Sequence, residues 1–225
     1  MVPDDIGVII PAYNAENTIG RIIEGLCLIG FDRKNIILVD DGSVDNTAGI
    51  AFKWGVEVIR IKKNSGKGYA LRLGFQEAIS KGLKMVFTLD ADGQHRVSEI
   101  QNFLKFFRDY DLIIGTRTID SKKMPFIRNI VNRTTSLVIS LLSHRYIPDV
   151  QSGFRLINLK IFDKVRLKTK NFQTESEIVY KAIKNGYRIQ FVPVSTIYHN
   201  NGKSYINPII DTLRFVNMAV RFLWV

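Results

Sequence analysis

MVFTLDADGQH, residues 85–95, is the stretch that decides the fold. It begins with five apolar or β-branched residues, as in a strand buried on both faces, and an acidic turn follows directly. Similar short apolar runs occur at residues 6–11, 35–39, 56–61 and 112–115. Apolar side chains at three- and four-residue spacing, which predict helices, occur in residues 19–26, 70–79 and 100–107. This alternation predicts an α/β fold with a mostly parallel sheet flanked by helices.

The composition is that of a globular protein. Of the 225 residues 46% are hydrophobic and 24% are charged, which excludes a disordered tail, a collagen-like rod and a coiled coil. The single cysteine, Cys27, rules out an intrachain disulfide and a zinc site built on several thiolates. We find no signal-peptide pattern and no uncharged stretch of the about 18 residues that span a bilayer, so we expect a cytoplasmic protein.

The positive charge is concentrated in the second half of the chain. The formal net charge is +11. Residues 1–120 contain 15 Lys and Arg against 16 Asp and Glu, whereas residues 121–225 contain 17 against 5. This asymmetry predicts an anionic partner, although a generally basic, solvated surface is the alternative. Zinc-finger and aromatic RNA-binding motifs are absent, which argues against nucleic acid and leaves phosphate groups or an acidic membrane.

Polar clusters follow three of the predicted strands, at residues 11–17, 40–43 and 90–95. Ligands of parallel α/β sheets bind at the carboxyl ends of the strands, where these clusters would meet. Asp90 and Asp92 lie two residues apart, so in extended backbone their carboxylates point to the same side. Together with the amide oxygen of Gln94 they form a set of hard oxygen ligands suited to Mg²⁺ or Mn²⁺, with positions left for substrate phosphates.

Two further features suit a nucleotide. Asp40 and Asp41, after the second strand, are able to accept hydrogen bonds from a ribose or a base edge. Lys67 stands between two glycines at the start of a predicted helix, which favours contact with a phosphate or a ribose over the alternative of a plain loop lysine. The spacing is not that of a P-loop, and no GxGxxG supports a dinucleotide-binding Rossmann fold.

The motifs together resemble a known family. IPAYNAENTI, VDDGSVDNT, NSGKGYALRLG, LDADGQH and IIGTR occur in the order and spacing of the family 2 glycosyltransferases of the GT-A fold. DVQSGFR (149–155) and GYRIQFVPV (186–194) resemble the dolichyl-phosphate mannose synthase branch. The resemblance covers residues 6 to about 200. It implies transfer of a sugar from a nucleotide-diphosphate sugar such as GDP-mannose or a UDP-hexose, usually with inversion, to a polyprenyl or dolichyl phosphate.

The resemblance also assigns residues to the donor site. It places the nucleoside against Pro11, Tyr13 and Glu16, and the base or ribose at Asp40 with Asp41 nearby. Lys67 would lie at the nucleotide. The metal, and through it the diphosphate, would be held by Asp90, Asp92 and Gln94, with Asp92 a catalytic residue.

The acceptor site is implied in the same way. Arg117 and Arg128 would be catalytic residues, Arg117 facing the donor or acceptor phosphate and Arg128 contacting the acceptor phosphate. Ser152 and Arg155 would shape the site. The chain departs from the branch at Asn132, where a serine is common, and at His199, which replaces the arginine of an R-x-x-G-x-S loop. Lys203 would supply the missing charge.

The acceptor decides whether a general base is needed. A lipid monophosphate, with a second pKa of about 6, is already ionised at neutral pH. A sugar or protein hydroxyl would instead need a carboxylate base, for which Glu175 and Glu177 are candidates, although both also fit as acids in the first turn of a helix. A non-catalytic nucleotide-sugar or membrane-binding module is the alternative outside enzymes.

Two segments are broadly amphipathic, residues 125–142 and 208–225. Both suit helices at a membrane interface, with packing on the catalytic core, a homodimer or a membrane partner subunit as alternatives. We therefore predict a catalytic domain over 1–204, divided into a nucleotide-sugar half (1–120) and an acceptor half (121–204), and a C-terminal helix over 205–225. The protein would act peripherally at the cytoplasmic face of a membrane.

Overall fold

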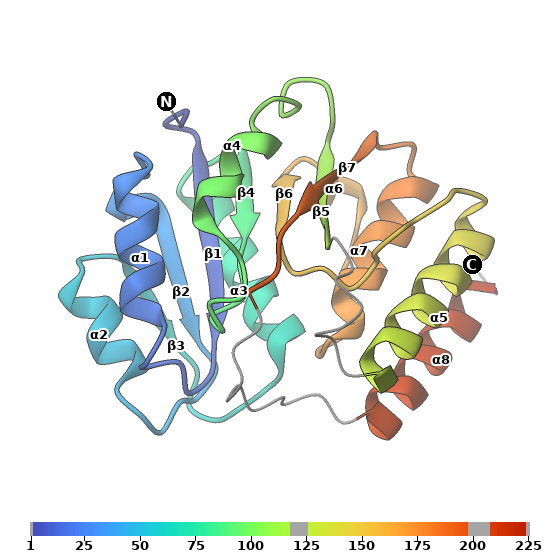
Figure 1. Ribbon diagram of the computed structural model, residues 1–225, viewed down its shortest axis with the longest axis horizontal. Coiled ribbons are helices and arrows are strands. Elements are labelled where there is room, and N and C mark those ends of the chain that lie inside the picture. Colours follow the sequence, from blue (N-terminus) through green and yellow to red (C-terminus); the bar gives the residue numbers. More distant parts are fainter. Residues whose placement is uncertain (1, 118–125, 198–207, 224–225) are drawn as a thin grey trace.

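One seven-stranded sheet forms the centre of the molecule (Figure 1). The computed structural model describes residues 2–117, 126–197 and 208–223, and their side chains except those of 126–129, 208–211 and 223. The strands are β1 (Ile6–Ala12), β2 (Ile36–Asp40), β3 (Glu57–Arg60), β4 (Met85–Thr88), β5 (Leu112–Arg117), β6 (Arg155–Asn158) and β7 (Ile189–Val194). Their spatial order is β3-β2-β1-β4-β6-β5-β7, and every pairing is parallel except those of β6 with β4 and β5. The predicted mostly parallel sheet is confirmed.

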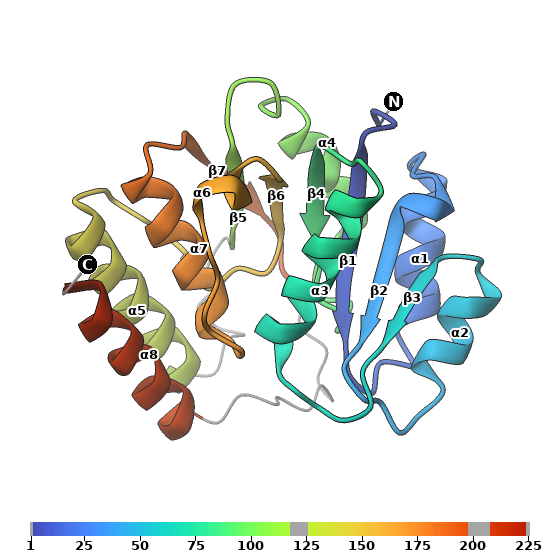
Figure 2. The same cartoon turned by 180° about the vertical axis from the view of Figure 1, so that it is seen from behind.

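Both faces of the sheet are covered by helices, as Figures 1 and 2 show from opposite sides. Successive residues of a strand point to opposite faces, so Ile9 packs into one apolar core while Val8 and Ile10 pack into the other. This explains why the central strands β1, β2 and β4 are nearly continuous apolar runs without alternation. The helices are α1 (Ile19–Leu28), α2 (Thr47–Lys53), α3 (Lys67–Ser80), α4 (Ile100–Phe103), α5 (Phe126–Ser143), α6 (Ile161–Lys164), α7 (Gln173–Lys184) and α8 (Pro208–Leu223).

The helix patterns were predicted closely for α1, whose stripe of Ile19, Ile22, Ile23 and Leu26 is buried. In α3 the stripe is buried except that Leu73 is partly buried and Ile79, near the end of the helix, is 49% exposed. The strands β6 and β7 were not predicted as strands. Because β7 pairs with β5 and β6 lies between β4 and β5, strands from both sides of residue 120 form one sheet. The division of the catalytic domain at residue 120 into a nucleotide-sugar half and an acceptor half stays a prediction about function.

The two predicted amphipathic segments form the helices α5 and α8, which pack side by side at one end of the molecule (Figures 1 and 2). The α8 helix also contacts α7, where the ring of Phe222 stacks on Tyr180 with 4.0 Å between centroids. Packing on the catalytic core, the alternative to a membrane interface, therefore accounts for one face of α8. No helix within the described ranges is both long enough and apolar enough to span a membrane.

A glycine sets the contact between α3 and the sheet. A Cβ atom on Gly74 would overlap Cγ2 of Ile9, which is fully buried on β1. A Cβ atom on Gly25, in the middle of α1, would lie 3.5 Å from the side chain of Val97, an ordinary contact. Both positions gain helix propensity on change to alanine, but only Gly74 has no room for the methyl group.

We therefore predict opposite effects of two identical substitutions. Gly25→Ala raises the free energy of unfolding by about 0.5–1 kcal/mol through helix propensity. Gly74→Ala lowers it by about 1–3 kcal/mol through overpacking. Urea denaturation followed by circular dichroism measures both. Equal stabilisation by the two substitutions would show that α3 is not packed so closely on β1.

Candidate active site

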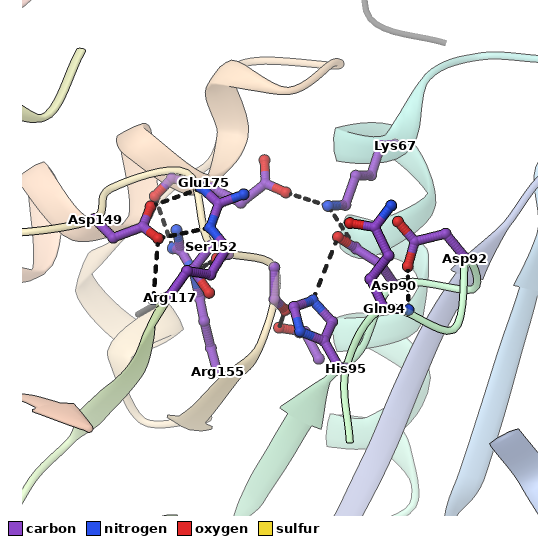
Figure 3. Close-up of polar contacts among 12 residues, drawn as sticks. Lys67, Asp90, Asp92, Gln94, His95, Arg117, Asp149, Ser152, Arg155 and Glu175 are labelled. Carbon is purple, nitrogen blue, oxygen red and sulfur yellow. Dashed lines mark hydrogen bonds and ion pairs between the residues drawn. The ribbon is translucent and has the colours of Figure 1, made fainter. Parts of the chain in front are cut away.

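The candidate site lies at the edge of the sheet where β1, β2 and β4 end. The loops after these strands carry three of the predicted polar clusters. The first turns of α3 and α7 lie next to the loop after β4. Lys67 on α3 therefore contacts both Asp90 in that loop and Glu175 on α7 (Figure 3). The predicted donor residues and part of the acceptor half thus share one site.

Lys67 is held between two carboxylates. Its Nζ lies 2.6 Å from Oδ1 of Asp90, in the loop after β4, and 2.6 Å from Oε1 of Glu175, on α7 (Figure 3). Burial opposes the charge on Lys67, but the two carboxylates outweigh this cost and hold the pKa of Lys67 above its ordinary value. Burial likewise favours protonation of Asp90, but Lys67 and then His95 hold its pKa far below the ordinary value. This ion pair therefore stays charged at any physiological pH.

Asp92 is the carboxylate next to this cluster. Its Oδ1 accepts a hydrogen bond of 2.9 Å from the backbone N–H of Gln94 (Figure 3). Burial, and secondly the charge of Asp90, raise the pKa of Asp92. The negative charge of Asp90 beside Asp92 favours a cation near the two carboxylates.

The fit to a divalent cation follows from this donor set. Asp90, Asp92 and Gln94 come from one loop and offer carboxylate and amide oxygens, which are ligands for Mg²⁺ and Mn²⁺. No group of three or more His, Cys, Asp or Glu side chains within the described part of the chain is arranged to hold a metal. Asp90, Asp92 and Gln94 would supply part of the coordination of such a cation and would leave positions for another molecule, such as a diphosphate.

The loops after β1 and β2 are tied to each other. Glu16 accepts a hydrogen bond from the N–H of Asn46 through its Oε2, and its own N–H donates to Asp45. The N–H of Asn14, which has a positive φ of 51°, donates to Oγ of Ser43. Pro11 is buried and Tyr13 is partly buried at the end of β1. These contacts hold Glu16 and the backbone of Asn14 against the loop after β2, next to Pro11 and Tyr13 in the chain.

Asp40 and Asp41 differ in what they hold. Asp41 accepts hydrogen bonds from the N–H groups of Ser65 and Gly66, at 2.7 and 2.9 Å, and thereby orders the loop that leads into α3. Burial raises its pKa against these hydrogen bonds. Asp40 is fully buried, accepts a hydrogen bond from the N–H of Ser43 and lies 3.3 Å from Nε of Arg60.

The start of α3 is docked on the start of α7. A Cβ atom on Gly66 would overlap Asn171, and one on Gly68 would overlap Oγ1 of Thr174. The N–H of Tyr69 donates to the carbonyl of Lys170 at 3.1 Å. The glycines beside Lys67 are thus explained by close approach of residues 170–174, and they place Lys67 facing Glu175.

Arg117 is bound by a residue of the 149–155 motif. Its Nε and its terminal amino group donate to the two oxygens of Asp149, at 2.7 and 2.9 Å (Figure 3). Burial favours protonation of Asp149, but Arg117 outweighs it and lowers the pKa of Asp149. A contact of Arg117 with a phosphate, as the resemblance implies, would have to be made beside or in place of this pair.

Arg155 and Ser152 lie in the interior of the site. Arg155 donates to the backbone carbonyls of Ser152, Val150 and Glu175, at 2.7, 2.7 and 2.8 Å. It therefore ties the 150–152 loop to the first turn of α7, and any effect on an acceptor would be exerted through that loop. Burial lowers the pKa of Arg155 to about 10, so it remains charged. The hydroxyl of Ser152 is buried, with no hydrogen-bond partner among the described residues.

The two candidate bases have different surroundings. Glu177 accepts hydrogen bonds from the N–H groups of Lys168 and Thr169, from the hydroxyl of Thr169 and from Lys181. Burial favours its protonation, but Lys181 and then Thr169 lower its pKa. Glu177 thus anchors the 168–169 segment, whereas Glu175 faces Lys67 with both carboxylate oxygens buried.

Three predicted acceptor residues are not placed. His199 and Lys203 lie outside the described residues, and Arg128 lies on α5 with its side chain outside them. Two residues of the site had no assigned role, Asp149 and His95. Nε2 of His95 lies 3.8 Å from Asp90, and its ring packs on Phe154. His95 lies in the LDADGQH motif and Asp149 in the DVQSGFR motif, so these motifs were the signal in the sequence that could have pointed to both residues.

Comparisons with known proteins show the family of the chain. The model of the family described as "Glycosyl transferase family 2" matches residues 7–166. A UDP-N-acetylglucosamine–dolichyl-phosphate N-acetylglucosaminyltransferase of Methanococcus voltae is 34% identical, with 86% of each chain covered. A polyprenol monophosphomannose synthase of Mycolicibacterium smegmatis is 27% identical, over 84% of this chain and 76% of the relative.

The fold also has solved relatives. The glucosyl-3-phosphoglycerate synthase of Mycobacterium tuberculosis, crystallised with Mn²⁺, UDP and glucosyl-3-phosphoglycerate, superimposes with a TM-score of 0.73 at 17% identity. The match covers 97% of this chain and 78% of that one. At this identity it shows a shared fold, the GT-A fold that the motifs implied. The family model spans more than half of the chain and establishes that the chain belongs to glycosyl transferase family 2 and is a glycosyltransferase.

Proposed function

We propose that this glycosyltransferase moves a sugar from a nucleotide-diphosphate sugar to the phosphate of a polyprenyl or dolichyl lipid, with inversion and with the help of Mg²⁺ or Mn²⁺. The relatives named for dolichyl and polyprenol phosphate support the acceptor class. Crystals of a fold relative with Mn²⁺ and UDP support the donor class and the cation. The donor would be a GDP-sugar or a UDP-sugar, and a transfer assay with labelled sugars of both kinds distinguishes the two.

The surroundings of Glu175 are the observation that carries the proposal. Its carboxylate is paired with Lys67 and has both oxygens buried, and Glu177 is bound by backbone N–H groups and Lys181. Neither carboxylate is therefore free to take a proton from a hydroxyl acceptor. An ionised phosphate needs no such base, so the arrangement favours a phosphate acceptor.

In the proposed reaction an oxygen of the acceptor phosphate attacks the anomeric carbon. A new carbon–oxygen bond forms as the bond from that carbon to the diphosphate breaks, and the nucleoside diphosphate leaves with the electron pair. Asp92 and Gln94, with Asp90, would hold the cation, which supplies charge stabilisation for the leaving diphosphate. Lys67 lies beside them with a charge able to contact the same diphosphate. The loops after β1 and β2 would hold the nucleoside.

The end of the molecule formed by α5 and α8 supports action at a membrane. Large apolar side chains are exposed on both helices: Ile130, Leu137 and Leu141 on α5, and Leu213, Val216 and Val220 on α8. Exposed arginines accompany them, Arg133 on α5 and Arg214 and Arg221 on α8. Apolar and basic side chains together suit the surface of an anionic membrane. We place the protein peripherally at the cytoplasmic face of the membrane. In the alternative, a second copy of the chain or a partner subunit covers the exposed apolar side chains of α5 and α8.

A transfer assay tests the proposed reaction. The purified protein receives a panel of labelled GDP- and UDP-sugars and Mn²⁺, with or without polyprenyl phosphate in detergent. We expect label from one donor to enter the organic phase only when lipid phosphate is present, and to be lost with EDTA. Nucleoside diphosphate release that depends on a soluble sugar, with no organic label, would contradict the proposed acceptor.

Asp92→Asn tests the proposed cation site. The substitution removes a charge that would hold the cation, so we expect turnover to fall by about 10²-fold or more. Binding of the nucleoside without metal should stay unchanged. The matched control is Asp32→Asn, at an exposed residue whose carboxylate pairs with Lys34. Wild-type turnover by Asp92→Asn would exclude Asp92 from the site chemistry.

Glu175→Gln distinguishes the two acceptor classes. At saturating donor and Mn²⁺ we expect kcat to remain above about a tenth of the wild-type value, because no proton has to be removed. A general base would contribute about 10²–10⁴-fold to the rate. A loss of that size with intact nucleotide binding would favour a hydroxyl acceptor.

Leu213→Glu tests the membrane surface. Leu213 is 65% exposed on α8, so the substitution should leave folding intact and weaken binding to anionic phosphatidylglycerol vesicles by about tenfold. Leu28→Glu is the control, since Leu28 is 81% exposed on α1 at another part of the molecule (Figure 1). Vesicle sedimentation measures both. Unchanged vesicle binding by Leu213→Glu would contradict a role of this α8 surface.

A further inference from the structure

Lys67 stands where its charge affects every cation that approaches Asp90. Its ammonium lies 2.6 Å from Oδ1 of Asp90, the distance of a direct charged contact, and only 15% of its side chain is exposed. A divalent cation on Asp90 would meet this positive charge at close range. The two charges would therefore compete for one carboxylate.

The position of Lys67 is built into the fold. Gly66 and Gly68 on either side of it are packed against residues 170–174 so closely that neither position has room for a Cβ atom. Asp41 fixes the backbone of Ser65 and Gly66 from the opposite direction. The backbone of Lys67 is thus held from two sides, and the freedom that remains lies in its side chain.

Asp90 is also confined. A Cβ atom on Gly153 would lie 2.5–2.7 Å from the carboxyl group of Asp90, so backbone closes that side. His95 lies on its other oxygen at 3.8 Å. Since Asp90 has little room to turn away, the side chain of Lys67 is the group that can move when a cation is to be accommodated.

Glu175 offers Lys67 a second place. Both of its carboxylate oxygens are buried, and Lys67 is their charged partner among the described residues. Glu175 is therefore placed to act through Lys67. Its charge stabilises Lys67 after contact with Asp90 is given up, at little cost in desolvation because the ion pair already exists.

We propose that Lys67 is the built-in counter-charge of Asp90, that it competes with the divalent cation for this carboxylate, and that Glu175 is a positioning residue that draws Lys67 away. The inference rests on the cation requirement proposed above. Its consequence is coupling: the cation binds weakly to the free protein and more tightly once a nucleoside diphosphate gives Lys67 another anionic partner. Cation and donor thus bind cooperatively.

The test is the dissociation constant of Mn²⁺, measured by electron paramagnetic resonance of free Mn²⁺ with and without UDP or GDP. Lys67→Met removes the competing charge and should tighten Mn²⁺ binding without nucleotide by about tenfold. Glu175→Gln leaves Lys67 in contact with Asp90 and should weaken Mn²⁺ binding without nucleotide by about fivefold. The double variant Lys67→Met/Glu175→Gln removes both members of the ion pair and therefore leaves no unpaired buried charge that could cause misfolding. It should still bind Mn²⁺ more tightly than wild type.

Matched controls are Lys81→Met, at a partly exposed pair with Glu57 near the end of α3, and Glu177→Gln on α7. Both should stay within about twofold of wild type, and circular dichroism checks folding. Opposite shifts of the two single variants support the proposal, because a merely structural role would weaken binding in both. Mn²⁺ binding that is unchanged or weaker in both Lys67→Met and the double variant overturns it. If wild type binds no Mn²⁺ even with nucleoside diphosphate, the proposed cation requirement itself fails.

Discussion

The ion pair of Lys67 with Asp90 and Glu175 is the constraint on which the rest of the site depends. It joins the loop after β4, the start of α3 and the first turn of α7 through one ammonium group. Without Lys67, two carboxylates would remain close together in a largely buried place, at a cost of several kcal/mol. The tight glycine contacts at Gly66 and Gly68, and the hold of Arg155 on the backbone of Glu175, serve to bring these three charges together.

Much of the fold was predictable because its signals are local. The strands β1, β2 and β4 are continuous apolar runs, and α1 has a clear apolar stripe, so period and composition suffice. The strands β6 and β7 escaped prediction because polar residues break their apolar runs, Arg155 and Asn158 at the two ends of β6 and Gln190 in β7, and Pro193 interrupts β7. The insertion of β6 between β4 and β5 depends on a pairing partner about 70 residues away in the chain, about which local sequence is silent.

The same distinction holds for the site. Lys67, Asp90 and Asp92 stood out because their residue types and turns suit a diphosphate and a cation, and the family motifs supported them. Glu175 and Glu177 were equal candidates in sequence, since both lie in the first turns of one helix. Only their neighbours separate them, Lys67 for Glu175 and the backbone of residues 168–169 for Glu177. The pairing of Arg117 with Asp149 likewise joins residues that no local pattern connects.

The central claim is that the sugar is joined to a phosphate, and the bond itself can be observed. A donor labelled with ¹³C at the anomeric carbon is incubated with the protein, Mn²⁺ and polyprenyl phosphate, and the lipid product is examined by ¹³C and ³¹P nuclear magnetic resonance. We expect through-bond coupling between the anomeric carbon and the phosphorus of the lipid. A product whose anomeric carbon shows no phosphorus coupling, and is bonded instead to a hydroxyl oxygen, would contradict it.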